Sequence, residues 1–98
     1  MNNKFQKTLK EVFSSPTPKN IEWRRIETLL MALGCELIES SGSRVAFIYA
    51  GKRADFHRPH PNKEAKPYQV KAAAEYLIWI GIKHEHDDTY GIRLRRRV

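Results

Sequence analysis

The sequence predicts an α+β fold in which helices pack on one face of a small antiparallel sheet. The spacing of apolar residues changes after Gly34 from about 3.6, the helical period, to about 2, the strand period. Helical spacing returns near Pro67. The predicted order is therefore two helices, three strands and a helix, which leaves the opposite face of the sheet free. The 98 residues suit a single domain with one modest core.

The first helix is predicted at residues 3–13, because apolar side chains recur there at helical spacing. Such a stripe usually belongs to the domain's own core, and the alternative is an arm that packs on a partner. A Ser- and Pro-rich segment follows from Ser14, and proline cannot continue a helix. The stripe consists of Phe5, Leu9, Val12 and Phe13.

The second helix is predicted at residues 21–33, with Asn20 as its N-cap and Gly34 as its C-terminal stop. Trp23 lies near the start of this helix and is expected in the core. The apolar stripe consists of Ile26, Leu29, Leu30 and Leu33. The opposite face is expected to carry the charged residues Glu22, Arg24, Arg25 and Glu27.

Three strands are predicted at residues 35–39, 43–49 and 52–57, with a tight turn at Ala50-Gly51. Successive side chains of a strand point to opposite faces, so the last two strands each have two distinct faces. The apolar face is expected to carry Val45, Phe47, Tyr49, Ala54 and Phe56. The polar face of the third strand is expected to carry Arg53, Asp55 and His57.

The third helix is predicted at residues 67–80, because proline suits a first helical turn and Gly81 provides a stop. Trp79 is expected to pack in the core rather than to stack on a base. The buried stripe is expected to be Val70, Ala73, Ala74, Leu77 and Ile78. Residues 83–98 are predicted as a polar segment followed by a basic tail or a weak edge strand, with arginines at Arg93, Arg95, Arg96 and Arg97.

The charge of the chain favours an anionic partner. The formal net charge is +7 and the isoelectric point is near 9.8. Residues 44–71 hold seven Lys or Arg residues against two acidic ones, and this clustering favours nucleic acid over scattered surface charge. The candidates for binding RNA or phosphate are Arg44, Lys52, Arg53, Arg58, Lys63 and Lys66.

Several features indicate a cytoplasmic, soluble protein. Cys35 is the only cysteine, so no internal disulfide is expected and a reducing compartment fits. No apolar segment follows Lys4 as a secretory signal would require. The longest apolar run, from Tyr76 to Ile82, is too short to span a bilayer, so no membrane partner is expected.

The segment Phe56-His57-Arg58-Pro59-His60-Pro61 carries two histidines between prolines. RNA cleavage by the 2′-hydroxyl needs a group that removes its proton, a group that protonates the leaving oxygen, and positive charge over the phosphate. Histidine suits the first two roles near neutral pH and arginine suits the third. The candidate catalytic residues are therefore His57 and His60. The alternative is that both lie on a surface turn and hydrogen-bond to backbone.

The run His84-Glu85-His86-Asp87-Asp88 has the composition of a metal site. No cysteine or distant ligand pair completes the three or four ligands that zinc requires, so a solvated linker is the preferred interpretation. We expect no metal and no other cofactor.

Residues from about 21 to 82 resemble the HicA family of bacterial type II toxin–antitoxin modules. An N-terminal stretch like that of a HicA-like subgroup extends the resemblance to about residues 5–82, and the tail lies outside it. The matching pieces of the core are Leu33-Gly34, Gly42-Ser43, Pro59-His60, Lys63-Glu64 and Gly81-Ile82. Those of the N-terminal stretch are Thr8-Leu9, Phe13, Pro16 and Trp23.

The resemblance implies a dsRBD-like fold, similar to the double-stranded-RNA-binding domain, here with an extra N-terminal helix and a basic C-terminal tail. It also implies a metal-independent mRNA interferase, an RNA endonuclease that inhibits translation by acting on mRNA. A HicB-type antitoxin from the same operon would silence the toxin by covering its active site.

The chain departs from the family pattern at Arg44, where typical HicA proteins carry the histidine assigned to catalysis. Arginine cannot serve as a general base at neutral pH, because its pKa lies above about 12, but it can hold a phosphate. Either the base role has moved, with His57 and His60 as candidates, or the protein binds RNA without cutting it. A further alternative is an interaction protein whose basic surface binds an acidic antitoxin.

Overall fold

A computed structural model of the chain describes residues 3–59 and 62–82 and confirms the predicted α+β class. The predicted elements are all present, with ends that differ from the prediction by two residues or fewer. His60 and the predicted tail lie outside the described residues. The elements are α1 (Asn3–Val12), α2 (Trp23–Ala32), β1 (Glu36–Glu39), β2 (Arg44–Tyr49), β3 (Lys52–His57) and α3 (Pro67–Trp79).

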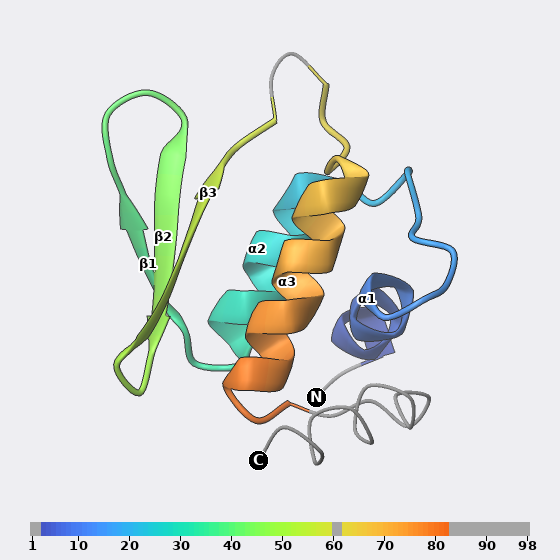
Figure 1. The fold of residues 1–98 in the computed structure, drawn as a ribbon, viewed down its shortest axis with the longest axis horizontal. Coiled ribbons are helices and arrows are strands. Elements are labelled where there is room, and N and C mark those ends of the chain that lie inside the picture. The colour runs from blue at the N-terminus through green and yellow to red at the C-terminus, as the bar shows by residue number, and fades with distance from the viewer. Residues whose placement is uncertain (1–2, 60–61, 83–98) are drawn as a thin grey trace.

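The elements form three layers (Figure 1). The sheet has the order β1-β2-β3 and is antiparallel throughout, as predicted. Helices α2 and α3 lie against one face of it, and α1 packs on the far side of this helix pair. Within the described part of the chain, the other face of the sheet carries no covering element. We call it the outer face.

The β2–β3 hairpin turns through Ala50 and Gly51, as predicted. Both residues have positive φ, 51° and 80°, and their neighbours Tyr49 and Lys52 are register partners. A two-residue turn with positive φ at both positions matches the right-handed twist of the strands. Glycine adopts this conformation without strain and alanine does not, so Gly51 suits the turn better than Ala50. The turn fixes the register of the two strands that carry the candidate site.

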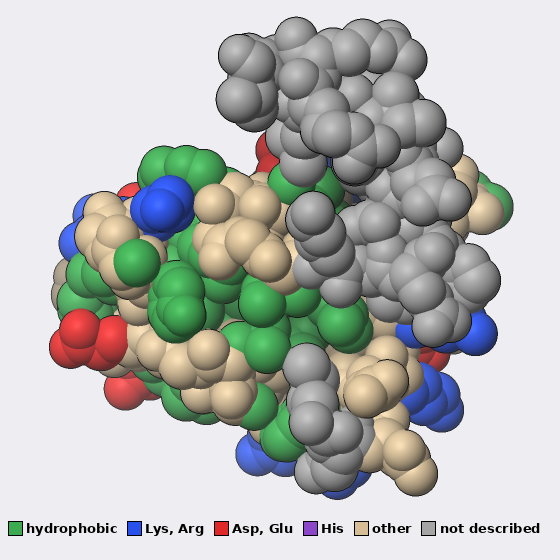
Figure 2. Space-filling model, turned by 90° about the horizontal axis from the view of Figure 1, so that it is seen from below, with side chains coloured by type: hydrophobic (Ala, Val, Ile, Leu, Met, Phe, Trp, Pro, Cys, Tyr) green, Lys and Arg blue, Asp and Glu red, His purple; other side chains and the backbone are tan. Residues whose placement is uncertain are grey.

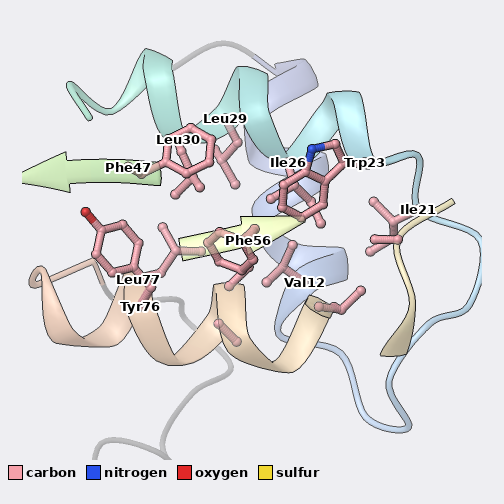
Figure 3. Packing of buried hydrophobic residues seen from close by; sticks show 14 of the residues in the cluster. Val12, Ile21, Trp23, Ile26, Leu29, Leu30, Phe47, Phe56, Tyr76 and Leu77 are labelled. Carbon is pink, nitrogen blue, oxygen red and sulfur yellow. The ribbon is translucent and has the colours of Figure 1, made fainter. Parts of the chain in front are cut away.

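The core lies between the sheet and the pair of α2 and α3, and it extends between that pair and α1 (Figure 3). Phe47 of β2 is fully buried, and Phe56 of β3 packs 5.1 Å from Trp23 of α2, measured between ring centroids. Leu9, Val12 and Phe13 are also buried, which confirms that the stripe of α1 belongs to the domain's own core. No described helix is long and apolar enough to cross a membrane.

The start of α2 corrects the prediction of Asn20 as N-cap. The N-cap is Glu22, and α2 begins at Trp23. The segment before it pairs with the loop that precedes α3, because the Trp23 amide donates to the Lys63 carbonyl (2.9 Å) and the Ala65 amide donates to the Ile21 carbonyl (2.7 Å). These bonds require extended backbone, so the helix cannot begin earlier.

Two side chains lie on faces that the sequence did not predict. Trp79 is 56% exposed instead of buried. It follows Glu75 by four residues, which places both on the solvent side of α3. Glu27 is buried instead of solvated. It follows Trp23 by four residues on the core side of α2, where it accepts a hydrogen bond from the indole N–H.

Candidate nucleic-acid interface

Arg44 and His57 form a cross-strand pair at the open end of the β2–β3 hairpin. They are register partners, and both side chains are exposed. The Arg58 amide donates to the Ser43 carbonyl at 2.8 Å. The next pair, Arg44 and His57, therefore occupies a non-hydrogen-bonded position, where the Cα atoms lie about 4.5 Å apart and side chains are closest. Both side chains point to the outer face, because their strand neighbours Val45 and Phe56 point into the core.

Asp55 and Arg53 lie on the same face of β3 as His57, as predicted. The Arg53 guanidinium donates to Asp55 through Nε and Nη2, at 3.1 Å and 2.9 Å from Oδ1. These hydrogen bonds lower the pKa of the Asp55 carboxyl, and the charges of Arg53 and Arg44 lower it further. Asp55 therefore neutralises part of the charge of Arg53. Arg44 forms no ion pair with any described residue, so it is free to hold a phosphate.

Arg58 follows His57 but belongs to the helix side of the sheet. Its Nε and Nη2 donate to the two carboxylate oxygens of Glu27 at 2.7 Å and 3.2 Å, and Nη2 lies 2.8 Å from Oε2 of Glu39. Hydrogen bonds to Glu27 and then to Glu39 raise the pKa of the guanidinium. Arg58, which was predicted to bind phosphate, is thus held by two carboxylates. Through them it links the end of β3 to α2 and β1.

Glu27 and Gln69 support the candidate site and were not identified from the sequence. Glu27 holds Arg58, as described above. The side-chain amide of Gln69 donates through Nε2 to the backbone carbonyl of His57 (2.6 Å). Its Oε1 accepts a hydrogen bond from the backbone N–H of Lys66 (2.9 Å). Gln69 is buried, so it fixes the backbone of His57 to the start of α3. Its place three residues after the N-cap of α3, where Glu or Gln often bonds the cap backbone, was the available signal.

The structure gathers some of the predicted site residues and separates others. Arg44, Arg53 and His57 share the outer face. Lys63 and Lys66 are exposed in the segment that precedes α3 and is tied to His57 through Gln69. Lys52 begins β3, five residues before His57, so it lies roughly 17 Å away along the strand.

The chemistry of the described site is that of basic side chains and one exposed imidazole. No group of three or more His, Cys, Asp or Glu residues able to hold a metal occurs within residues 3–59 and 62–82. Cys35 is buried, as predicted, and burial raises the pKa of its thiol. An arrangement of this kind can bind an anion beside an imidazole.

A comparison with protein families matches residues 23–77 to the family described as HicA toxin of bacterial toxin-antitoxin. The match covers more than half of the chain and runs from the start of α2 into the last turns of α3. The chain belongs to the HicA family. It is therefore a toxin-type chain, whose family implies an antitoxin partner. Neither the curated proteins nor the solved structures gave a significant match.

The region that matches the HicA family contains the whole described site. It includes the pair of Arg44 and His57 and the buried supports Glu27 and Gln69. Helix α1 precedes the match but contributes to the same core. Its attachment includes hydrogen bonds from Arg25 of α2 to Thr8, at 3.1 Å from Nη2, and an ion pair of Arg25 with Glu11. The HicA core and the added helix thus form one packed unit.

Proposed function

We propose that this HicA toxin is an mRNA interferase that cuts mRNA without a metal ion on the outer face of its sheet. The observation that carries the proposal is the pair of His57 and Arg44, an exposed imidazole beside an arginine without an ion-pair partner in the described chain. The open face gives a single strand of RNA access to both side chains.

The cleavage proposed here proceeds by attack of the 2′-hydroxyl on the adjacent phosphorus. A base removes the hydroxyl proton, the bond from phosphorus to the 5′-oxygen breaks, and an acid protonates that oxygen. The products are a 2′,3′-cyclic phosphate and a 5′-hydroxyl end. His57 and His60 share the base and acid roles, since imidazole exchanges a proton near neutral pH. Arg44 stabilises the charge on the phosphate oxygens.

Neighbouring cations extend the proposed interface along the RNA backbone. Lys63 and Lys66 are exposed in the segment that is tied to His57 through Gln69, and Arg53 is exposed on the same outer face as His57, four residues away along β3. Each contact with a phosphate releases a counterion and so contributes affinity that falls with salt. The silencing partner proposed for the toxin is a HicB-type antitoxin, and the proposed compartment is the cytoplasm, where mRNA is found.

The test is incubation of the purified protein with a long single-stranded mRNA in EDTA. We expect fragments with 2′,3′-cyclic phosphate ends, and we expect none from His57→Ala or His60→Ala. Tyr68→Ala is the matched control, because Tyr68 is 64% exposed and not part of the proposed catalytic group. Cutting by the histidine variants at the rate of the parent would show that the proposed site is wrong.

A second candidate function is RNA binding without cleavage, and Arg44 favours it. Arginine replaces the histidine that typical HicA proteins carry at this position, and it cannot act as a base. This candidate predicts a transcript that is shifted on a gel and stays intact during long incubation. Cutting that is absent in the parent and created by Arg44→His would support it.

A further inference from the structure

Helices α1 and α2 leave a cleft between them. Its volume is about 110 Å³, which is room for several water molecules. All the described residues that line it come from these two helices, three from each. They are Lys4, Phe5 and Thr8 of α1 and Arg24, Arg25 and Thr28 of α2.

The cleft between α1 and α2 is basic. Three of its six described lining residues are cationic and none of them is acidic. The face of the molecule seen from below is different, because hydrophobic side chains fill its centre and Lys and Arg lie toward its margins (Figure 2). Cations that line one small cavity raise the local potential and so attract an anion. The cleft therefore favours a negatively charged ligand.

Arg25 is held in the wall of the cleft by contacts with α1. Its Nε and Nη2 donate to the hydroxyl oxygen of Thr8 at 3.3 Å and 3.1 Å, and Nη2 also pairs with Glu11. Thr8 is only 2% exposed, and its hydroxyl donates to the Lys4 carbonyl at 3.2 Å. These contacts leave Nη1 of Arg25 without a hydrogen-bond partner among the described residues. The guanidinium can thus donate to a ligand without first becoming ordered.

Lys4 and Arg24 carry the positive charge of the cleft that the protein does not neutralise. Both side chains are exposed, and neither forms an ion pair with a residue that the structure describes. The charge of Arg25 is offset by Glu11. The cleft therefore keeps two uncompensated cations, one on each helix.

The arrangement of donors favours a phosphate ester over a carboxylate. A carboxylate has two oxygens in one plane, and a single arginine can satisfy both with two parallel hydrogen bonds. A phosphate ester has more oxygens in a tetrahedral arrangement, which suits separate donors from two helices. Phe5 adds an apolar wall, which suits the organic part of the ester.

We propose that the cleft between α1 and α2 binds the phosphate group of a nucleotide unit, with Lys4 and Arg24 as its charged ligands. Nη1 of Arg25 donates a further hydrogen bond, and Phe5 packs against the sugar or the base. The unit belongs to an RNA strand or to a free nucleotide, which present the same chemistry. The inference depends on neither RNA cutting nor the antitoxin. Helix α1 precedes the residues that match the HicA family, so half of this site lies outside the family region.

The test is an NMR titration of the full chain at low salt with adenosine 5′-monophosphate, followed at the backbone amides of Thr8 and Thr28. We expect both amides to shift, and we expect no shift with adenosine, which lacks the phosphate. Lys4→Gln and Arg24→Gln should each weaken binding about fivefold, the upper range for an exposed ion pair. Lys10→Gln is the matched control and should not weaken it, since Lys10 is exposed on α1 and does not line the cleft.

A short 2′-O-methyl RNA, which resists cutting, distinguishes the two sources of the phosphate. Shifts of Thr8 and Thr28 at lower concentrations of RNA than of the mononucleotide would assign the cleft to the RNA backbone. Shifts with the mononucleotide alone would assign it to a free nucleotide. Both results support a phosphate site.

Three results would overturn the proposal. Unmoved Thr8 and Thr28 amides with both the mononucleotide and the RNA would show that the cleft binds no phosphate. Equal shifts with adenosine would show that the phosphate is not what is recognised. Equal losses of affinity in Lys10→Gln and Arg24→Gln would show a general attraction to surface cations. None of these results bears on cutting at His57, which is measured separately on a long mRNA.

Discussion

The two ends of the β2–β3 hairpin differ in the side chains they expose. At the open end, Arg44 and His57 lie opposite each other on the outer face. At the turn end, Tyr49 and Lys52 lie opposite each other, and Lys52 approaches the exposed ring of Trp79. The first end carries charge suited to a polyanion, and the second exposes the rings of Tyr49 and Trp79 beside Lys52. The two ends of one hairpin thus lie beside two chemically distinct surfaces, and Lys52 and His57 are five residues apart along β3.

Different buried side chains support the two ends. Behind the open end, Glu27 and Gln69 hold the segment around His57 through an ion pair with Arg58 and a hydrogen bond to the His57 carbonyl. Behind the turn end, Tyr76 holds Trp79 and Lys52. Both surfaces are therefore supported by a buried polar or aromatic side chain of the helix layer. A surface that is rigidly supported can select its partner without first becoming ordered.

The largest expected effect is the loss of mRNA cutting when His57 is removed from the open end. We expect His57→Ala to lower the rate of mRNA cutting at least about 100-fold, the usual loss when a general acid or base is removed. Trp79→Ala should leave that rate within about twofold. Gel analysis of timed digests gives both rates, and equal losses in the two variants would contradict the division between the ends.

The next effect concerns the buried support of the histidine end. Glu27→Ala leaves Arg58 without its bidentate partner and the Trp23 indole N–H without an acceptor. We expect a loss of about 2–3 kcal/mol in the free energy of unfolding, below the range for full burial because the Arg58 side chain is 35% exposed. Urea denaturation measures it. Glu27→Gln keeps an acceptor for the indole N–H, so its free energy of unfolding should fall less. A decrease below about 1 kcal/mol in Glu27→Ala would show that the bonds of Glu27 to Arg58 and Trp23 do not stabilise the fold as described.

A smaller effect distinguishes two arginines of the outer face. Arg44→Ala should weaken RNA binding and lower the slope of log affinity against log salt by about one, as expected for one lost phosphate contact. Arg53→Ala should change the slope less, because Asp55 already pairs with that guanidinium. Affinities measured at several salt concentrations give the two slopes. A larger change of slope in Arg53→Ala than in Arg44→Ala would show that Arg53, and not Arg44, makes the phosphate contact.

The smallest effect is on the titration of Asp55. Its carboxyl pKa is lowered in the folded protein, first by hydrogen bonding to Arg53 and further by nearby charge. A lowered folded pKa stabilises the fold at pH values above the unfolded pKa, and this contribution is lost as pH falls through the folded value. NMR titration should show Asp55 returning toward its ordinary pKa in Arg53→Ala. An unchanged pKa would show that the ion pair does not persist in solution.

The sequence predicted the parts of the fold that depend on periodicity. Alternation in β3 correctly separated His57 from Phe56, and the turn residues at Ala50-Gly51 correctly fixed the hairpin. Family membership was also predicted and confirmed. These features follow from local spacing and turn chemistry, which a single sequence displays directly.

The sequence could not predict contacts that depend on how elements meet. From the sequence alone, Glu27 is expected to be a solvated surface charge. Only the packing of the end of β3 against α2 brings Arg58 to it. Trp79 reads as core by its size, but the buried positions on α3 are taken by residues such as Tyr76 and Leu77. Arg58 was predicted to hold phosphate, and its ion pairs with Glu27 and Glu39 depend on a packing that no local pattern shows. Its role in RNA binding stays a prediction.

The most direct test of the division between the two ends is an NMR titration of the full chain with a short single-stranded RNA that resists cleavage through 2′-O-methyl groups. The two signals to follow are the backbone amide of His57 and the indole N–H of Trp79. We predict that RNA shifts the His57 amide and leaves the Trp79 indole in place. A shift of the Trp79 indole with an unmoved His57 amide would place the RNA at the turn end and contradict the account.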